Sequence, residues 1–148
     1  MQMTVNIHQN MPLLKMGADP GQASASVILL HGRGSSAEGI TPLAEALEVD
    51  GLAFVIPQAA ENRWYPNSAF GPIESNEPDL SSALSMLDGL VTDLQVQGLP
   101  QDKIILGGFS QGACLAAEYT ARSGSSLGGL FILSGALIGP PGTPRNYP

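Results

Sequence analysis

The sequence has 148 residues, of which 43% are hydrophobic and 13% charged, a balance that predicts a packed domain and excludes a disordered chain. The formal net charge of −7 argues against nucleic acid as a partner, because binding to phosphates depends on clustered Lys and Arg. Neither a signal peptide nor a membrane-spanning segment of roughly 20 apolar residues is evident. Since Cys114 is the single cysteine and no internal disulfide can form, we expect a cytoplasmic protein.

The first half of the chain predicts part of a sheet with one helix. Apolar runs at residues 26–32 and 52–57 are typical of strands that are buried on both faces. Short β-like pieces precede them at residues 5–8 and 13–15. Between the two apolar runs, residues 41–49 predict a helix.

The second half opens with an irregular loop and then alternates between helix and strand. Residues 62–78 are rich in Pro, Gly, Asn and Ser, and loops of this length in compact domains are commonly functional. Leucines at i, i+3 and i+4 spacing predict an amphipathic helix over residues 79–99, with Asp79 as its cap. Strand, helix and strand follow at residues 103–108, 111–124 and 127–135. This alternation predicts a mostly parallel sheet with flanking helices, in a single domain over residues 1–148.

The motif Gly-Phe-Ser-Gln-Gly, residues 108–112, matches Gly-x-Ser-x-Gly between a predicted strand and a predicted helix. In a nucleophile elbow of this kind, small neighbours permit a tight turn that exposes the serine hydroxyl above the sheet. The motif therefore predicts Ser110 as a nucleophile. The backbone N–H of Gln111, at the start of the helix, is then an oxyanion donor.

A second glycine-rich segment, "HGRGSS" at residues 31–36, follows the first long predicted strand. In folds with a nucleophile elbow, such a loop supplies the other oxyanion donor, here the backbone N–H of Arg33. The competing interpretation is a dinucleotide fingerprint, since Gly32, Gly34 and Ala37 fit Gly-x-Gly-x-x-Ala. That fingerprint needs an acid about 20 residues further on, and the sequence has none near the end of the second predicted strand before Glu61.

Other candidate residues carry weaker signals. Trp64 and Tyr65, in the long loop, either line a substrate pocket for an acyl or aromatic group or pack into the core. Cys114 lies one helical turn after the motif serine and is interpreted as a small buried residue, since no neighbouring cation is evident to lower its pKa. His8 and His31 are isolated in the sequence, so the spacing predicts no metal site.

Five segments together resemble the phospholipase/carboxylesterase family of α/β-hydrolases, which includes acyl-protein thioesterases. They are "ILLHGRGSSAE", "PQAAENRWYP", "NEPDLSSAL", "IILGGFSQGACLAAEY" and "LSGALIG". The resemblance implies that Ser110 is the nucleophile, that Gln111 and Arg33 give the oxyanion amides, and that His31 shapes its loop without acting as the base. It also implies hydrolysis of carboxylic esters or thioesters on small or acyl-chain substrates, through an acyl-serine and without a cofactor.

The sequence departs from this family after the motif. In the α/β-hydrolase fold the order is Ser, then Asp, then His, but no Asp or His follows Ser110, and the one acid there is Glu118, on the predicted helix and directed away from the elbow. We therefore expect an incomplete α/β-hydrolase that lacks the last strands, which carry the acid and the base. Because a serine hydroxyl needs a base to become a strong nucleophile, the chain alone is expected to be nearly inactive.

The absence of the last strands also predicts an exposed sheet edge at the last apolar strand, which a second polypeptide or a second copy of the chain would cover.

The sequence also permits a different class of function. A non-catalytic binding or interaction module would keep the hydrolase fold and its pocket without the chemistry, and the missing Asp and His favour it.

Overall fold

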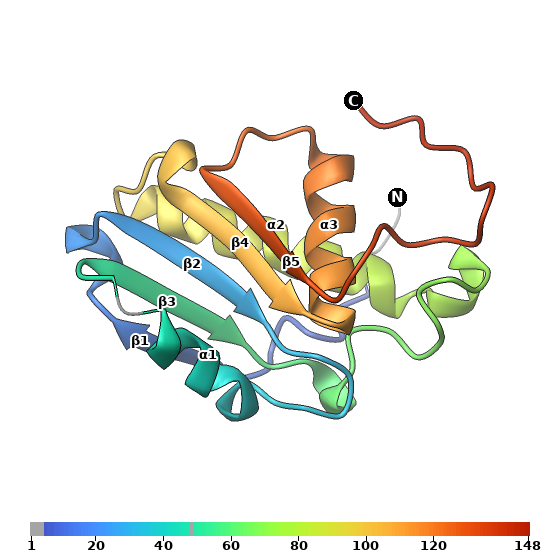
Figure 1. Ribbon diagram of the computed structural model, residues 1–148, viewed down its shortest axis with the longest axis horizontal. Helices are drawn as coiled ribbons and strands as arrows, with labels where there is room; N and C mark the ends of the chain where they lie inside the picture. Colours follow the sequence, from blue (N-terminus) through green and yellow to red (C-terminus); the bar gives the residue numbers. More distant parts are fainter. Residues whose placement is uncertain (1–4, 48) are drawn as a thin grey trace.

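The computed structural model describes residues 5–47 and 49–148 and contains one five-stranded sheet (Figure 1). The strands are β1 (Leu13–Gly17), β2 (Ala25–Leu30), β3 (Leu52–Pro57), β4 (Ile104–Phe109) and β5 (Gly129–Leu133). Their order across the sheet is β1-β3-β2-β4-β5. β1 runs antiparallel to β3, and the other neighbours are parallel. This is the mostly parallel sheet that the sequence predicts.

Helices cover both faces of the sheet, because the central strands are apolar on both sides. Ile28 and Leu30 of β2 face the larger core, where α2 (Asp79–Val96) and α3 (Gln111–Ser123) pack. Val27 and Leu29 face the smaller core under α1 (Thr41–Ala46). In Figure 1, α1 lies in front of the sheet and the other two helices lie behind it.

The predicted strand at residues 5–8 is wrong, because Val5 and Asn6 have no regular secondary structure and Ile7 and His8 form a bend. The backbone N–H groups of Ile7 and His8 donate to the Ser82 hydroxyl of α2, at 2.9 and 3.3 Å, instead of to a neighbouring strand. The predicted helix at residues 41–49 is shorter in the structure and ends at Ala46, while Glu48 lies outside the described residues.

The N-terminus of α2 is displaced by one residue from its predicted position. Pro78 occupies the N-cap position, and Asp79 is the first helical residue. A carboxylate in this first turn still interacts favourably with the positive end of the helix dipole.

Strand β5 lies at one edge of the sheet and pairs with β4 alone among the described strands. Its Leu130, Ile132 and Leu133 side chains are 39–40% exposed. An apolar strand with one unpaired side is a template for a further strand. This edge is the most apolar exposed part of the sheet.

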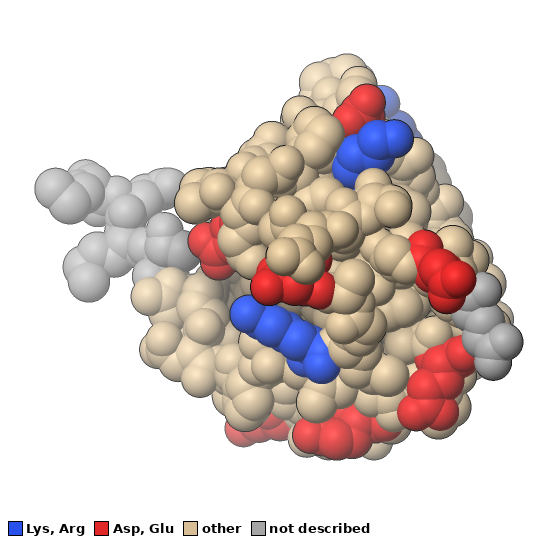
Figure 2. Space-filling model, turned by 90° about the vertical axis from the view of Figure 1, so that its left-hand side faces the viewer, with Lys and Arg blue, Asp and Glu red and all other residues tan. Residues whose placement is uncertain are grey.

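The charged side chains do not form a basic surface on the face shown in Figure 2. Acidic side chains occur around most of this face, and basic ones stand in separate places. No helix among the described residues is long and apolar enough to cross a membrane.

Candidate active site

Ser110 lies at the point where β4 ends and α3 begins, in a backbone conformation that is rare for a residue with a side chain. Its φ and ψ are 55° and −116°, and such conformations persist only where the surrounding structure holds them. The Ser110 N–H donates to the Leu133 carbonyl of β5 at 2.8 Å, and its carbonyl accepts from the Cys114 N–H at 3.0 Å. The residue is exposed. This is the geometry of a nucleophile elbow.

Two glycines make this turn sterically feasible. A Cβ at Gly108 would lie 2.5 Å from the carbonyl carbon of Gly112. A Cβ at Gly112 would collide with the Leu30 carbonyl and would lie 2.6 Å from the His31 carbonyl oxygen. Glycine at both positions therefore lets the start of α3 pack directly against the ends of β4 and β2, immediately after Ser110.

Two backbone N–H groups beside Ser110 are available to a ligand. Gln111 is the first residue of α3, so its N–H has no partner within the helix. Arg33 follows β2, and its backbone N–H has no hydrogen bond to the described part of the chain. Both residues line the cavity that Ser110 also lines. These are the two positions that the sequence predicts as oxyanion donors.

The side chains of the same two residues hold the loop after β3 in place. The Gln111 amide oxygen accepts from the Trp64 N–H at 2.7 Å, and its NH₂ group donates to the Tyr65 carbonyl at 2.8 Å. The Arg33 guanidinium donates to the Pro66 and Asn67 carbonyls, both at 2.6 Å. Sequence reasoning missed these roles, because they join residues 33 to 47 positions apart.

Two cavities meet at Ser110. One, of about 430 Å³, is lined by residues that include Tyr65, Ser68, Cys114 and Ser134. The other, of about 510 Å³, lies on the α1 side and is lined by residues that include Ile40, Leu43, Phe109 and Leu133. Arg33 lines both cavities.

The two aromatic residues of the loop have different positions. Trp64 is fully buried between the imidazoles of His8 and His31, with ring centroids 5.3 and 5.1 Å away, and it is not among the residues that line the cavities at Ser110. It therefore belongs to the core. Tyr65 is also fully buried, but it lines the first cavity.

Both histidines of the sequence use both ring nitrogens in hydrogen bonds to the backbone. In His31, Nδ1–H donates to the Gly32 carbonyl at 2.8 Å and Nε2 accepts from the Ala59 N–H at 3.1 Å. In His8, Nε2–H donates to the Trp64 carbonyl at 2.9 Å and Nδ1 accepts from the Ala60 N–H at 3.0 Å.

Burial lowers the pKa of both imidazoles below the ordinary value, so they are neutral at pH 7. With its acceptor nitrogen already bonded, neither His8 nor His31 is free to take a proton from Ser110. Among the described residues, no cluster of three or more His, Cys, Asp or Glu side chains is arranged to hold a metal ion.

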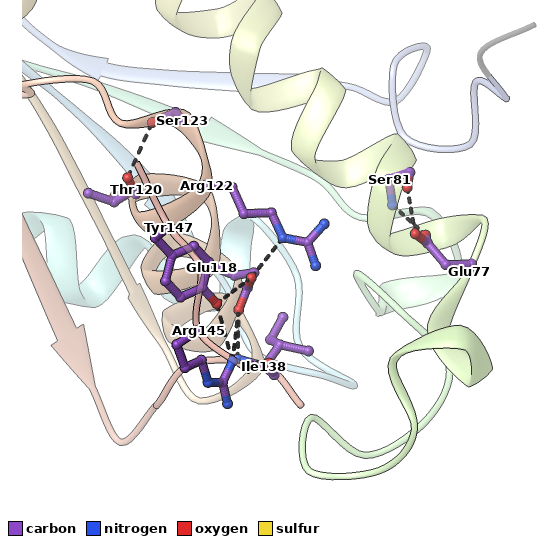
Figure 3. A network of polar contacts seen from close by, with 9 residues as sticks. All are labelled: Glu77, Ser81, Glu118, Thr120, Arg122, Ser123, Ile138, Arg145 and Tyr147. Carbon is purple, nitrogen blue, oxygen red and sulfur yellow. Dashed lines mark hydrogen bonds and ion pairs between the residues drawn. The ribbon is translucent and has the colours of Figure 1, made fainter. Parts of the chain in front are cut away.

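Glu118 lies on the far part of α3 and organises a separate network (Figure 3). Its buried carboxylate accepts hydrogen bonds from Arg122 Nε at 2.7 Å, Tyr147 Oη at 2.8 Å and the Ile138 N–H at 2.9 Å. The bonds from Tyr147 and Ile138 tie the segment after β5 to α3. Glu118 is therefore a structural anchor and is not among the residues that line the cavities at Ser110.

A protein-family model described as phospholipase/carboxylesterase matches residues 15–147 of this chain. The chain belongs to this family. Acyl-protein thioesterase 1 of Kluyveromyces lactis is 34% identical over 136 residues, and lysophospholipase-like protein 1 of Mus musculus is 31% identical over 134 residues.

Two solved structures are similar to the chain in fold and in sequence. A phospholipase/carboxylesterase from Dyadobacter fermentans is 38% identical, with a TM-score of 0.90 over 99% of this chain. The esterase PE8 is 27% identical, with a TM-score of 0.69 over 90% of this chain. The fold is therefore that of an α/β-hydrolase, as the resemblance of the sequence implies.

The match covers only part of each relative. The chain spans 60% of the yeast thioesterase, 56% of the mouse protein and 69% of the Dyadobacter chain. About a third or more of each relative therefore has no counterpart in this sequence.

Proposed function

We propose that this chain carries the nucleophile and the oxyanion donors of a hydrolase that cleaves carboxylic esters or thioesters. The observation that supports this most strongly is the strained turn at Ser110, which exposes the residue beside the backbone N–H groups of Arg33 and Gln111. Membership of the phospholipase/carboxylesterase family and the matches to acyl-protein thioesterases agree with it.

The reaction forms an acyl-serine intermediate. A general base takes the proton from Ser110 Oγ, which attacks the carbonyl carbon, and the N–H groups of Arg33 and Gln111 stabilise the resulting oxyanion. Collapse of this tetrahedral oxyanion releases the alcohol or thiol, which receives the proton from the base, and leaves the acyl-serine. Water then attacks the acyl-serine with help from the same base, which releases the carboxylic acid and restores the free hydroxyl of Ser110.

The base does not come from the described residues, because both imidazoles are bonded through both nitrogens. Oxyanion stabilisation without a base leaves roughly 10³- to 10⁴-fold acceleration over water, against a loss on the order of 10⁶ when the serine or histidine of a complete triad is removed. The chain alone is therefore nearly inactive. The exposed edge of β5 is covered by a second polypeptide or by a second copy of this chain. We place the protein in the cytoplasm.

Covalent labelling by a fluorophosphonate, detected by intact-protein mass spectrometry, tests the proposal. The chain alone should label slowly at Ser110, and addition of the C-terminal part of the Dyadobacter protein should accelerate labelling. Ser110→Ala should abolish it. Ser134→Ala is the matched control, because Ser134 lines the same cavity and also has a positive φ, of 59°. Absence of labelling under both conditions contradicts the proposal.

The bonded histidines favour a second candidate, a non-catalytic binding module of the same fold. This module would bind ester ligands in the cavities at Ser110 equally well before and after Ser110→Ala. It would show no ester turnover with any added polypeptide. Labelling that depends on Ser110 excludes it.

A further inference from the structure

The Tyr65 hydroxyl is a buried donor with an unused hydrogen bond. Its side chain is fully buried, it lines the cavity at Ser110, and its oxygen has no hydrogen-bond partner among the described residues. Burial raises the pKa of the phenol, so the O–H remains protonated in the ordinary pH range. A buried hydroxyl without an acceptor destabilises the protein, so its retention needs a reason.

The surroundings of this hydroxyl offer only a poor acceptor. The Cys114 thiol lies beside it, but sulfur accepts hydrogen bonds weakly, and the same sulfur already accepts from the Ala136 N–H at 3.4 Å. The other two tyrosines of the chain differ in this respect. Tyr119 donates to a carboxylate oxygen of Asp88 at 2.8 Å, and Tyr147 donates to one of Glu118 at 2.8 Å.

The two cavities at Ser110 differ in chemistry. The cavity with Tyr65 is also lined by Ser68 and Ser134. On the α1 side, the lining residues include the apolar Ile40, Leu43, Phe109 and Leu133, beside Arg33 and Ser35. A carbonyl group held at Ser110 has one half of its ester on each side, so the two halves meet different surroundings.

We propose that Tyr65 is a specificity residue, which donates a hydrogen bond to an acceptor oxygen in one half of the ester substrate. The substrate class is an ester with one apolar half and one half that carries an ether, carbonyl or hydroxyl oxygen near the scissile carbonyl. This inference rests on the proposed function, because it assumes that an ester occupies Ser110. A purely alkyl group in the first cavity leaves the Tyr65 O–H without an acceptor.

Binding measurements with isosteric ester pairs test this inference without requiring turnover. The 148-residue chain with Ser110→Ala is titrated with each ester by ligand-observed NMR. In the acyl arm, methyl methoxyacetate is compared with methyl butanoate. In the alcohol arm, 2-methoxyethyl acetate is compared with butyl acetate. Each pair differs by one oxygen in place of one CH₂ group, so the arms show which half of the ester faces Tyr65.

The ether should bind more tightly than its alkyl partner in one arm, by up to about tenfold, because one buried hydrogen bond contributes at most about 1.5 kcal/mol. Adding Tyr65→Phe should reverse this preference, since a cavity without the donor disfavours an ether oxygen. Tyr119→Phe is the matched control and should keep the preference. Thermal unfolding verifies that both variants fold, as expected for Tyr65→Phe, which removes no hydrogen bond to the protein.

A preference for the alkyl ester in both arms, or equal binding of both members in both arms, overturns the inference. So does an ether preference that Tyr65→Phe leaves unchanged. These outcomes are separate from the fluorophosphonate test. Labelling at Ser110 without an ether preference refutes only the role of Tyr65, whereas an ether preference without labelling refutes the hydrolase and keeps the binding site.

Discussion

Replacement of Gly112 by Ala tests whether close contact between α3 and the end of β2 forms the turn at Ser110. The added Cβ would meet the backbone carbonyls of Leu30 and His31, which cannot rotate away as a flexible side chain could. The helix must therefore move away from β2. Overpacking of this kind costs about 3 kcal/mol at the upper end of its usual range, and the helix propensity of Ala returns about 1 kcal/mol.

The expected result for Gly112→Ala is thus a loss of about 2 kcal/mol in the free energy of unfolding. Gly89→Ala is the matched control. Gly89 is an exposed residue within α2, and a Cβ there meets nothing within 4 Å. Only the propensity and chain-entropy terms act at that position, so Gly89→Ala should raise stability by about 0.5–1 kcal/mol.

Urea unfolding, followed by fluorescence of the buried Trp64, measures both changes, and labelling of Ser110 by a fluorophosphonate reports on the turn. Labelling should slow in Gly112→Ala and remain unchanged in Gly89→Ala. If Gly112→Ala is as stable as the original chain, α3 can accommodate a Cβ beside the Leu30 and His31 carbonyls, and the contact between α3 and β2 does not require glycine. If it is destabilised but labels at the original rate, the contact does not control the nucleophile.

Three further predictions concern the rest of the molecule. Glu118→Ala removes the acceptor of the buried Ile138 N–H and should lower the free energy of unfolding by about 2 kcal/mol. Glu118→Gln keeps an acceptor and should lower the free energy of unfolding by less. Equal urea midpoints for the two variants would contradict this. Because burial lowers the folded pKa of His8 and His31 below 6.5, the unfolded chain binds protons first on acidification. Stability should then fall below about pH 6.5 by up to about 1.4 kcal/mol per pH unit for each histidine, and identical urea midpoints at about pH 7.5 and about pH 5.5 would refute it. Ile132 is exposed on β5 and should promote association between copies of the chain. Sedimentation velocity should therefore show concentration-dependent association, and Ile132→Lys should remove it. A chain that stays monomeric at every concentration would oppose this prediction.

The parts of the fold that were predicted correctly depend on local sequence patterns. Apolar runs predict β2, β3, β4 and β5, because buried parallel strands are apolar on both faces. The motif at residues 108–112 predicts the turn at Ser110, because its two glycines and its serine are adjacent in the chain. Nothing outside this short segment is needed to recognise it.

The parts that sequence reasoning missed depend on contacts between distant residues. The segment at 5–8 has the composition of a strand, but its N–H groups bond to Ser82, 74 and 75 positions away. Both histidines are held by backbone groups, which in three of the four bonds are 28 to 56 positions distant. The Gln111 side chain joins α3 to a loop 46 and 47 positions earlier. No periodicity or motif records such pairings.

The position of β5 determines which occupant of its edge can complete the site. Parallel strands end at the same side of the sheet, where Ser110 and Ser134 lie, so a strand added parallel to β5 ends about 10 Å from Ser110. A histidine in the loop after such a strand, or after a further parallel strand beside it, can reach Ser110. If β5 of a second copy paired antiparallel, its end would lie at the opposite side of the sheet. Such a dimer would cover Ile132 without bringing a base to Ser110, so association of the chain with itself and acceleration of labelling are independent observations.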